Sequence, residues 1–354
     1  MKKNTRENKE IREYILSHIE NHSADIGSKI IATFGISRAA ASGYLQRLVK
    51  QGLLQAKGNT RARRYKLKSI VDKVFSINLK GTYGTGSEDA VWRERVLPLM
   101  KDVKKNIVDI CQYCFTEMLN NAIDHSVSDD AVITYEQFHN RIKMRVMDHG
   151  VGIFEKIKND FRLADARMAL LELTKGKLTS DTKNHSGVGI FFTSRMLDTF
   201  HIGSGHLDYI RTRYDADDWL FETHDVAKFR KGTAITMEID MTTDRTTRSV
   251  FEKYQGGNLI SFHKTHVPIK LAQYPGEKLV SRSQAKSILA RFEDFTEVYL
   301  DFEGVEEIGQ AFADQIFRIF KNDHPDVTIV ATHTTLAIDR MIAYVQHSES
   351  KAQS

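Results

Sequence analysis

Cysteine is scarce in this sequence of 354 residues, which contains only Cys111 and Cys114. A lone C-x-x-C pair can belong to a redox motif or to half of a zinc site. No second cysteine pair is present to complete a tetrahedral zinc site, and both cysteines fall in a segment, residues 106–122, that we expect to be helical. We therefore expect two reduced, partly buried thiols.

Long hydrophobic runs are also missing. No apolar stretch approaches the roughly 18 to 20 residues needed to span a bilayer. The basic start of the chain is not followed by the apolar segment of a secretory signal. With 41% hydrophobic and 27% charged residues, the composition is that of an ordinary globular protein. We expect a cytoplasmic protein with no membrane partner, and the length favours two or three domains.

Positive charge is concentrated at the N-terminus. Residues 1–70 hold 15 Lys and Arg against 5 Asp and Glu, whereas the remainder holds 36 against 41. This asymmetry indicates a basic N-terminal module that binds a polyanion, joined to a remainder of the chain that does not. A disordered basic tail is the alternative, and the regular pattern of the same residues argues against it.

That pattern predicts short helices followed by a hairpin. Ile11, Ile15 and Ile19 recur at helical spacing and form one apolar stripe. Ser37 suits the N-cap of a later helix that ends near Gly52. The buried face of this helix would comprise Ala41, Leu45, Leu48 and Val49, and a Gly-Asn pair at residues 58–59 marks the turn of a hairpin.

Residues 35–54 and the hairpin after them resemble the winged helix-turn-helix of transcription regulators. The resemblance implies a DNA-binding domain over residues 1–70 whose partner is double-stranded DNA. Arg38 and Ser42 lie at the start of the expected recognition helix, near base edges in the major groove. The hairpin would contact phosphates or the minor groove through Arg61, Arg63 and Arg64. A winged helix that binds protein instead is the alternative.

The pattern G-x-x-x-x-G-K-[ST] is absent, which excludes a P-loop. Four other segments could bind a nucleotide instead. In the first, residues 115–126, Glu117, Asn121 and His125 are spaced by four and so lie on one face of a helix. A solvated helix face would be the plainer interpretation if this segment stood alone.

The other three segments follow in order. In residues 146–153, Asp148 ends a strand, and glycines at 150 and 152 let a flat base approach the backbone. In residues 185–192, glycines open a helix whose N-terminal N–H groups favour phosphate. Residues 231–237 form a late strand.

In this order the four segments resemble the Bergerat or GHKL fold of type II topoisomerases, mismatch-repair ATPases, sensor histidine kinases and anti-sigma-factor kinases. The resemblance implies an α/β sandwich over residues 71–250, with a mixed sheet and helices on one face, that binds ATP and Mg²⁺. By it, Asp148 accepts the adenine amino proton, Asn121 holds magnesium, and Glu117 is the general base. The remaining ATP contacts would come from Gly150, Gly152, Gly187, Gly189 and Thr233.

The polar segment at residues 173–184 would then be a mobile lid over ATP. Lys175 and Lys177 could reach phosphate, but we favour solvated lysines. Sensor histidine kinases place a phosphoacceptor histidine well before the asparagine helix, and no histidine occurs between His22 and His125. This absence disfavours the histidine kinase branch.

Strands and helices alternate in the C-terminal region, residues 251–354. We predict strands at 267–273, 298–302 and 327–332, and helices at 283–292, 311–320 and 336–347. This order implies a small parallel or mixed sheet covered by helices.

The strand-to-helix turn at residues 301–313 resembles that of STAS domains, and more specifically the uncharacterised STAS-like domain found fused to GHKL modules. Phosphorylated STAS proteins carry a hydroxyl in this turn, whereas Gly309, Gln310 and Ala311 occupy it here. We expect a regulatory domain that docks a protein partner.

Together these features predict an α+β multidomain protein: an ATP-binding, nucleotide-gated DNA-binding regulator. Its GHKL module would be an ATPase or a serine/threonine kinase. One alternative is a kinase that resembles anti-sigma-factor kinases, with Glu117 activating an acceptor hydroxyl on another protein. Another is an ATP-dependent stress or defence effector that assembles through the STAS-like domain. A second copy of the chain, in a homodimer, is a further candidate partner.

Overall fold

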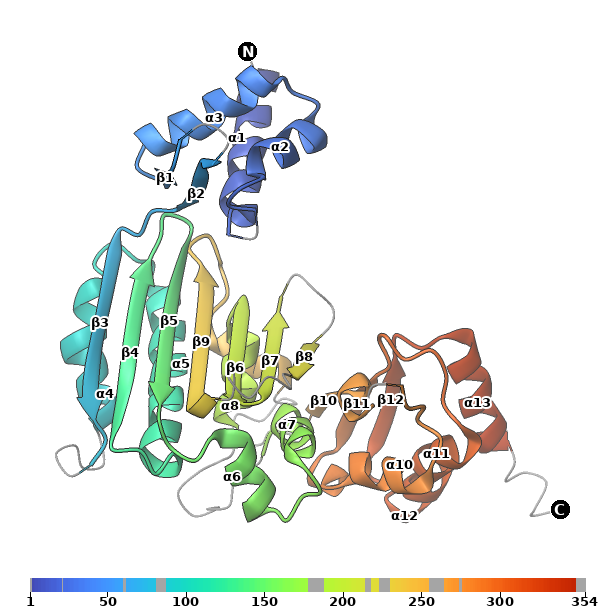
Figure 1. The fold of residues 1–354 in the computed structure, drawn as a ribbon. Helices are drawn as coiled ribbons and strands as arrows, with labels where there is room; N and C mark the ends of the chain where they lie inside the picture. The colour runs from blue at the N-terminus through green and yellow to red at the C-terminus, as the bar shows by residue number, and fades with distance from the viewer. Residues whose placement is uncertain are drawn as a thin grey trace. The chain divides into compact units, whose positions relative to one another are not determined.

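The computed structural model describes residues 2–20, 22–59, 62–80, 87–177, 188–213, 218–222, 230–254, 264–273 and 276–347. The chain forms two compact units. The first comprises residues 1–74, 134–143 and 240–242, and the second comprises residues 75–133, 144–239 and 243–354. The mixture of helices and several sheets confirms the α+β prediction (Figure 1).

The first unit contains three helices and a hairpin. Its elements are α1 (Lys2–His18), α2 (Ile26–Phe34), α3 (Arg38–Lys50), β1 (Leu54–Lys57) and β2 (Arg64–Leu67), with β1 and β2 antiparallel. The predicted isoleucine stripe is buried, and it packs with Leu45 and Leu48 of α3. Ser37 caps α3 as predicted, since its Oγ accepts the N–H of Ala40 at 3.2 Å.

A seven-stranded sheet has the strand order β3-β4-β5-β9-β6-β7-β8. Most of its residues belong to the second unit. The strands are β3 (Val71–Asn78), β4 (Asp130–Gln137), β5 (Arg141–Asp148), β6 (Thr199–Gly205), β7 (Leu207–Thr212), β8 (Asp218–Glu222) and β9 (Arg230–Asp240). Buried residues alternate with partly exposed ones along β4 and β5, as expected for a sheet covered on one face.

The helices of this region are α4 (Ser87–Val91), α5 (Lys105–His125), α6 (Ile153–Asp160), α7 (Ala166–Lys175), α8 (Gly189–Met196) and α9 (Thr247–Tyr254). A π-helical turn (Trp92–Val96) and a 3-10 turn (Leu97–Leu99) follow α4. Helices α5 and α8 pack together behind the strands (Figure 1). Cys111 and Cys114 of α5 are free, as predicted, and more deeply buried than expected.

The C-terminal part of the same unit has a three-stranded parallel sheet, β10-β11-β12. Its elements are β10 (Lys264–Pro268), a 3-10 turn (Ile269–Ala272), α10 (Arg282–Leu289), a 3-10 turn (Phe292–Asp294), β11 (Glu297–Asp301), α11 (Gln310–Asp314), a π-helical turn (Gln315–Phe320), α12 (Lys321–Asp323), β12 (Thr328–Thr332) and α13 (Leu336–His347).

The alternation of strand and helix in this part is confirmed, but the first strand was wrongly bounded. It ends at Pro268 instead of residue 273. Ile269 and Leu271 continue the apolar alternation, yet both are buried in a 3-10 turn. Within the described residues, no helix has both the length and the apolar character needed to cross a membrane.

Candidate functional site

Asp148, the last residue of β5, is the centre of the candidate site. Its side chain is buried, with the residue only 5% exposed. One carboxylate oxygen, Oδ1, accepts the N–H of Gly150 at 2.9 Å and the N–H of Thr233 at 3.2 Å. Burial raises the pKa of the Asp148 carboxyl, and these two backbone donors oppose the rise. The strand end is therefore fixed to the loop after it and to β9.

Glycines let backbone segments approach closely around this carboxylate. A side chain at Gly150 would place its first carbon 1.8 Å from the carbonyl oxygen of Ser126. At Gly232, which has a φ of 82°, the same atom would lie 2.2 Å from the carbonyl oxygen of Asp148. Gly152 also adopts a left-handed conformation, with a φ of 84°. Glycine is therefore required at these positions by close backbone packing or by a positive φ, which the sequence alone did not reveal.

A small cavity opens beside the loop. Its volume is about 80 Å³, and its lining includes Gly150, Phe154, Ala166, Ser204, Leu207 and Gly232. The wall therefore combines glycine backbone with apolar residues from α6, α7 and β7, and Glu155, His206 and Lys231 also line it. Thr233 borders the same loop, because its Oγ1 accepts the N–H of Ile153 at 2.9 Å.

The second part of the candidate site lies where α5 meets the start of α8. A side chain at Gly189 would place its first carbon 2.0 Å from Oε2 of Glu117, so the carboxylate lies against the first residue of α8. Tyr113 lies one turn before Glu117 on α5. Its pKa is raised mainly by burial and further by the negative charge of the Glu117 carboxylate. Asn121 lies one turn after Glu117 and is also half-buried.

The two parts of the site are joined by the C-terminal end of α5. The carbonyl oxygen of Ser126 accepts the N–H of Val151 at 2.8 Å. This contact holds the loop after Asp148 against α5. Ser126 and Gly232 were not among the predicted site residues. The position of Gly232 directly before Thr233 was the one feature of the sequence that could have indicated its place in the site. Gly187 lies outside the described residues.

The expectation of a solvated Lys175 within the lid segment is wrong, and residues 173–175 of that segment belong to α7, whereas Lys177 is half-buried. Lys175 is the last residue of α7 and is completely buried. Its Nζ donates to Oε1 of Glu172 at 2.5 Å and to the carbonyl oxygen of Ala290 at 2.9 Å. The Nζ of Lys177 donates to the carbonyl oxygen of Asp294 at 2.6 Å. Residues 178–184 lie outside the described part of the chain.

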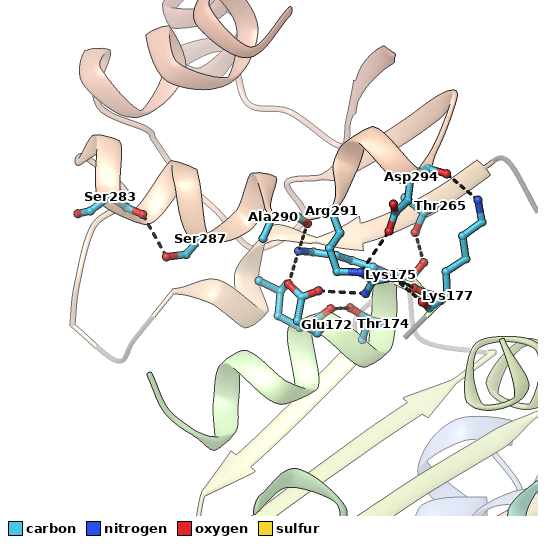
Figure 2. A network of polar contacts seen from close by, with 12 residues as sticks. Glu172, Thr174, Lys175, Lys177, Thr265, Ser283, Ser287, Ala290, Arg291 and Asp294 are labelled. Carbon is cyan, nitrogen blue, oxygen red and sulfur yellow. Dashed lines mark hydrogen bonds and ion pairs between the residues drawn. The ribbon is translucent and has the colours of Figure 1, made fainter. Parts of the chain in front are cut away.

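The C-terminal region provides groups that contact both lysines and this end of α7 (Figure 2). Arg291 donates to Glu172 at 3.2 Å and to the carbonyl oxygens of Gly176 at 3.0 Å and Lys177 at 2.6 Å. The hydroxyl of Thr265 donates to the carbonyl oxygen of Lys175 at 2.7 Å. The end of α7 would otherwise leave carbonyls unpaired, and a cation there is favourable. More than 85 residues separate the partners in sequence, so no local pattern could predict the contact.

The basic residues predicted to contact DNA lie in the first unit. Arg38 is exposed at the first position of α3, and Ser42 is half-buried one turn later. Arg64 is exposed at the first position of β2, and Arg63 is exposed directly before it. Arg61 lies outside the described residues. A further exposed cation, Arg47 on α3, lies 4.3 Å from the centre of the Tyr44 ring.

Comparison with known protein families gives one match. Residues 284–341 match a family described as a STAS-like domain of unknown function (DUF4325). The matched segment begins in α10 and ends in α13, so it covers β11, β12 and the helix between them. The STAS-like prediction for the C-terminal part is therefore confirmed. No curated protein matches the chain.

Proposed function

We propose that residues 71–250 bind ATP with magnesium in a GHKL-type site, and that the chain is an ATP-gated DNA-binding regulator. The environment of Asp148 carries this proposal. A buried carboxylate that is fixed through one oxygen, with glycine backbone beside it, suits a flat base that presents an amino group. In this proposal Asp148 accepts from the adenine amino group, and Gly150, Gly152 and Thr233 border the base.

The phosphate end of the nucleotide would lie between α5 and α8. Gly189, together with Gly187, would present backbone N–H groups to phosphate at the start of α8. Asn121 would hold magnesium through its amide oxygen, and bound magnesium would neutralise phosphate charge. The contact between Glu117 and Gly189 supports a general base at this end, because the carboxylate lies where a water or a hydroxyl could meet phosphate.

The first unit would bind duplex DNA. The motivating observations are its net positive charge and the exposure of Arg38, Arg63 and Arg64 on α3 and in the hairpin. Phosphate contacts by such cations would give affinity, and the start of α3 would read base edges. Gating then requires that apo, ADP-bound and ATP-bound protein differ in affinity for DNA or for a partner.

The STAS-like region would take part in the gating through α7. Arg291 and Thr265 donate to the carbonyls of residues 175–177, in the first part of the segment, residues 173–184, that we predicted as the lid. A change in the lid would therefore act on the C-terminal region, and a partner bound there would act on the lid. This linkage is reciprocal in binding free energy.

Calorimetric titration with ATP tests the nucleotide site. In Asp148→Asn, the remaining amide oxygen can still accept both backbone N–H groups, so the loop should stay in place. The amide nitrogen would present a donor to the adenine amino group, at a cost of about 1–3 kcal/mol, or roughly 5- to 150-fold in affinity. Asp129→Asn, at an exposed position, is the matched control. Unchanged ATP affinity in folded Asp148→Asn would remove Asp148 from the site.

Two assays separate regulation from kinase activity. DNA enrichment from genomic fragments with apo, ADP-bound and ATP-bound protein should give different yields if the chain is a nucleotide-gated regulator. The position of Glu117 equally suits activation of an acceptor hydroxyl. Transfer of radiolabel from ATP to a protein partner, without duplex affinity in any nucleotide state, would favour the serine/threonine kinase.

A further inference from the structure

The C-terminal edge of the small parallel sheet brings together carboxylates and imidazoles from separate strands. Asp301 is the last residue of β11, and Glu303 follows it by two residues. His333 comes directly after β12, whose last residue Thr332 is the register partner of Asp301. Because parallel strands end at the same edge, the fold itself makes this cluster. Ligand sites favour this edge in open α/β sheets.

The atoms in this cluster are close enough to share one ion. The Nδ1 of His333 lies 2.8 Å from Oδ1 of Asp301 and 3.8 Å from Oε2 of Glu303. In a tetrahedral zinc site, bonds of about 2.0–2.2 Å place neighbouring ligand atoms about 3.3 Å apart. The two distances lie on either side of that value. Within the described residues, these three side chains form a group able to hold a metal ion.

Burial supplies an independent reason for a ligand at this point. The Glu303 side chain is 35% exposed, but its Oε2 atom is buried and accepts no hydrogen bond from the part of the chain that the structure describes. A buried carboxylate oxygen without a partner is unfavourable, and a cation would satisfy it. Asp301 is itself only 6% exposed. His333 adopts a left-handed φ of 50°, which is uncommon for a residue other than glycine.

We propose that Asp301, Glu303 and His333 bind a divalent transition-metal ion of the zinc class. Two carboxylates and a neutral imidazole together match the charge of a divalent cation. The imidazole favours zinc and similar ions over magnesium and calcium, which prefer oxygen ligands. The Nε2 of His266 on β10 lies 3.7 Å from Oδ2 of Asp301, so the third strand of the sheet also contributes a side chain beside the site. The fourth coordination position remains open to water or to a ligand.

The test is a titration of full-length, metal-free protein with zinc against a chromogenic chelator, without nucleotide. We expect one zinc equivalent to bind wild-type protein. Binding at that site should weaken at least tenfold in His333→Gln and in Glu303→Gln, whose side chains are the more exposed ligands. His324→Gln, in the same region but outside the cluster, should bind as the wild type does.

A thermal melt in the same samples checks folding and linkage. Zinc should raise the melting temperature of wild-type protein and of His324→Gln, and should leave that of His333→Gln unchanged. If folded His333→Gln and Glu303→Gln bind zinc as the wild type does, or if wild-type protein binds none, the proposal is overturned and the cluster is an ion pair. Neither result bears on the nucleotide site, because the titration contains no ATP.

Discussion

The buried ion network at the end of α7 makes a sharp prediction about Glu172. This carboxylate is 2% exposed and lies between two cations, Lys175 at 2.5 Å and Arg291 at 3.2 Å. Glu172→Gln keeps the shape of the side chain but leaves both cations without their shared counter-charge. Breaking a buried pair in this way typically costs about 3–5 kcal/mol. We therefore expect a loss of this size in the free energy of unfolding.

Lys175→Met provides the contrast that tests the reasoning. It removes the buried ammonium, while Glu172 keeps its contact with Arg291. The loss should be nearer to about 1–2 kcal/mol, mainly the hydrogen bond to the carbonyl of Ala290. Glu277→Gln, at an exposed glutamate, is the control for the change of Glu to Gln.

The pH dependence should distinguish the variants further. Burial lowers the pKa of Lys175, and Glu172 is the main group that raises it again. Without Glu172 the folded-state pKa falls further below the ordinary value of 10.5. Between these two values the unfolded chain binds more protons, so stability rises with pH. Measured at neutral pH and again nearer pH 10.5, Glu172→Gln should therefore recover stability relative to Lys175→Met as the pH rises.

Urea denaturation followed by circular dichroism at both pH values measures these differences. Equal stability of Glu172→Gln and Glu277→Gln at neutral pH would contradict the role assigned to the Glu172 carboxylate. A larger loss in Lys175→Met than in Glu172→Gln would also contradict it, because the carboxylate would then not be the group that stabilises the network.

Three further predictions follow from the two candidate sites. Glu117→Gln should bind ATP normally but release phosphate roughly 100-fold more slowly, and an unchanged rate would exclude a general base there. Arg63→Ala with Arg64→Ala should weaken binding to all duplexes and reduce the slope of log affinity against log salt by about 0.9 per lost contact. Asp148→Asn should melt no lower than wild-type apoprotein at neutral pH. Because burial raises the pKa of Asp148, wild-type stability is lost as pH rises through that raised value, and the advantage of asparagine should shrink in acid.

Helix capping and hydrophobic periodicity predicted those helices and strands that depend on neighbouring residues in the sequence. Ser37 is a good N-cap wherever it precedes a helix, and it caps α3. The order of strands and helices after residue 261 was readable because hydrophobic periodicity changes between them. The same rule failed at residues 267–273, where Val267, Ile269 and Leu271 alternate as in a strand. Pro268 has no N–H to donate, and the chain turns there into a 3-10 segment.

Burial that depends on contacts between residues far apart in the sequence could not be predicted. Lys175 sits in a polar segment that looks solvated, and its burial depends on Thr265 and Arg291, about 90 and 116 residues later. Similarly, the spacing of Glu117 placed it on a helix face, but its contact with Gly189 required α5 and α8 to pack together. Patterns over a few residues record local geometry, whereas these contacts are set by the tertiary fold.

Two of the buried acids of the second unit, Glu172 and Asp148, show why burial alone does not identify a site. Glu172 lies between Lys175 and Arg291, so its charge is neutralised by the fold that buries it. The described hydrogen bonds of Asp148 come instead from two backbone N–H groups at one oxygen, and burial still raises its pKa. Stability explains the first arrangement, because the ions satisfy one another. It does not explain the second, since a neutral amide would accept the same two hydrogen bonds without the desolvation of a charge. The nucleotide that we propose would supply a reason for the carboxylate, because the adenine amino group would use its charge and its second acceptor oxygen.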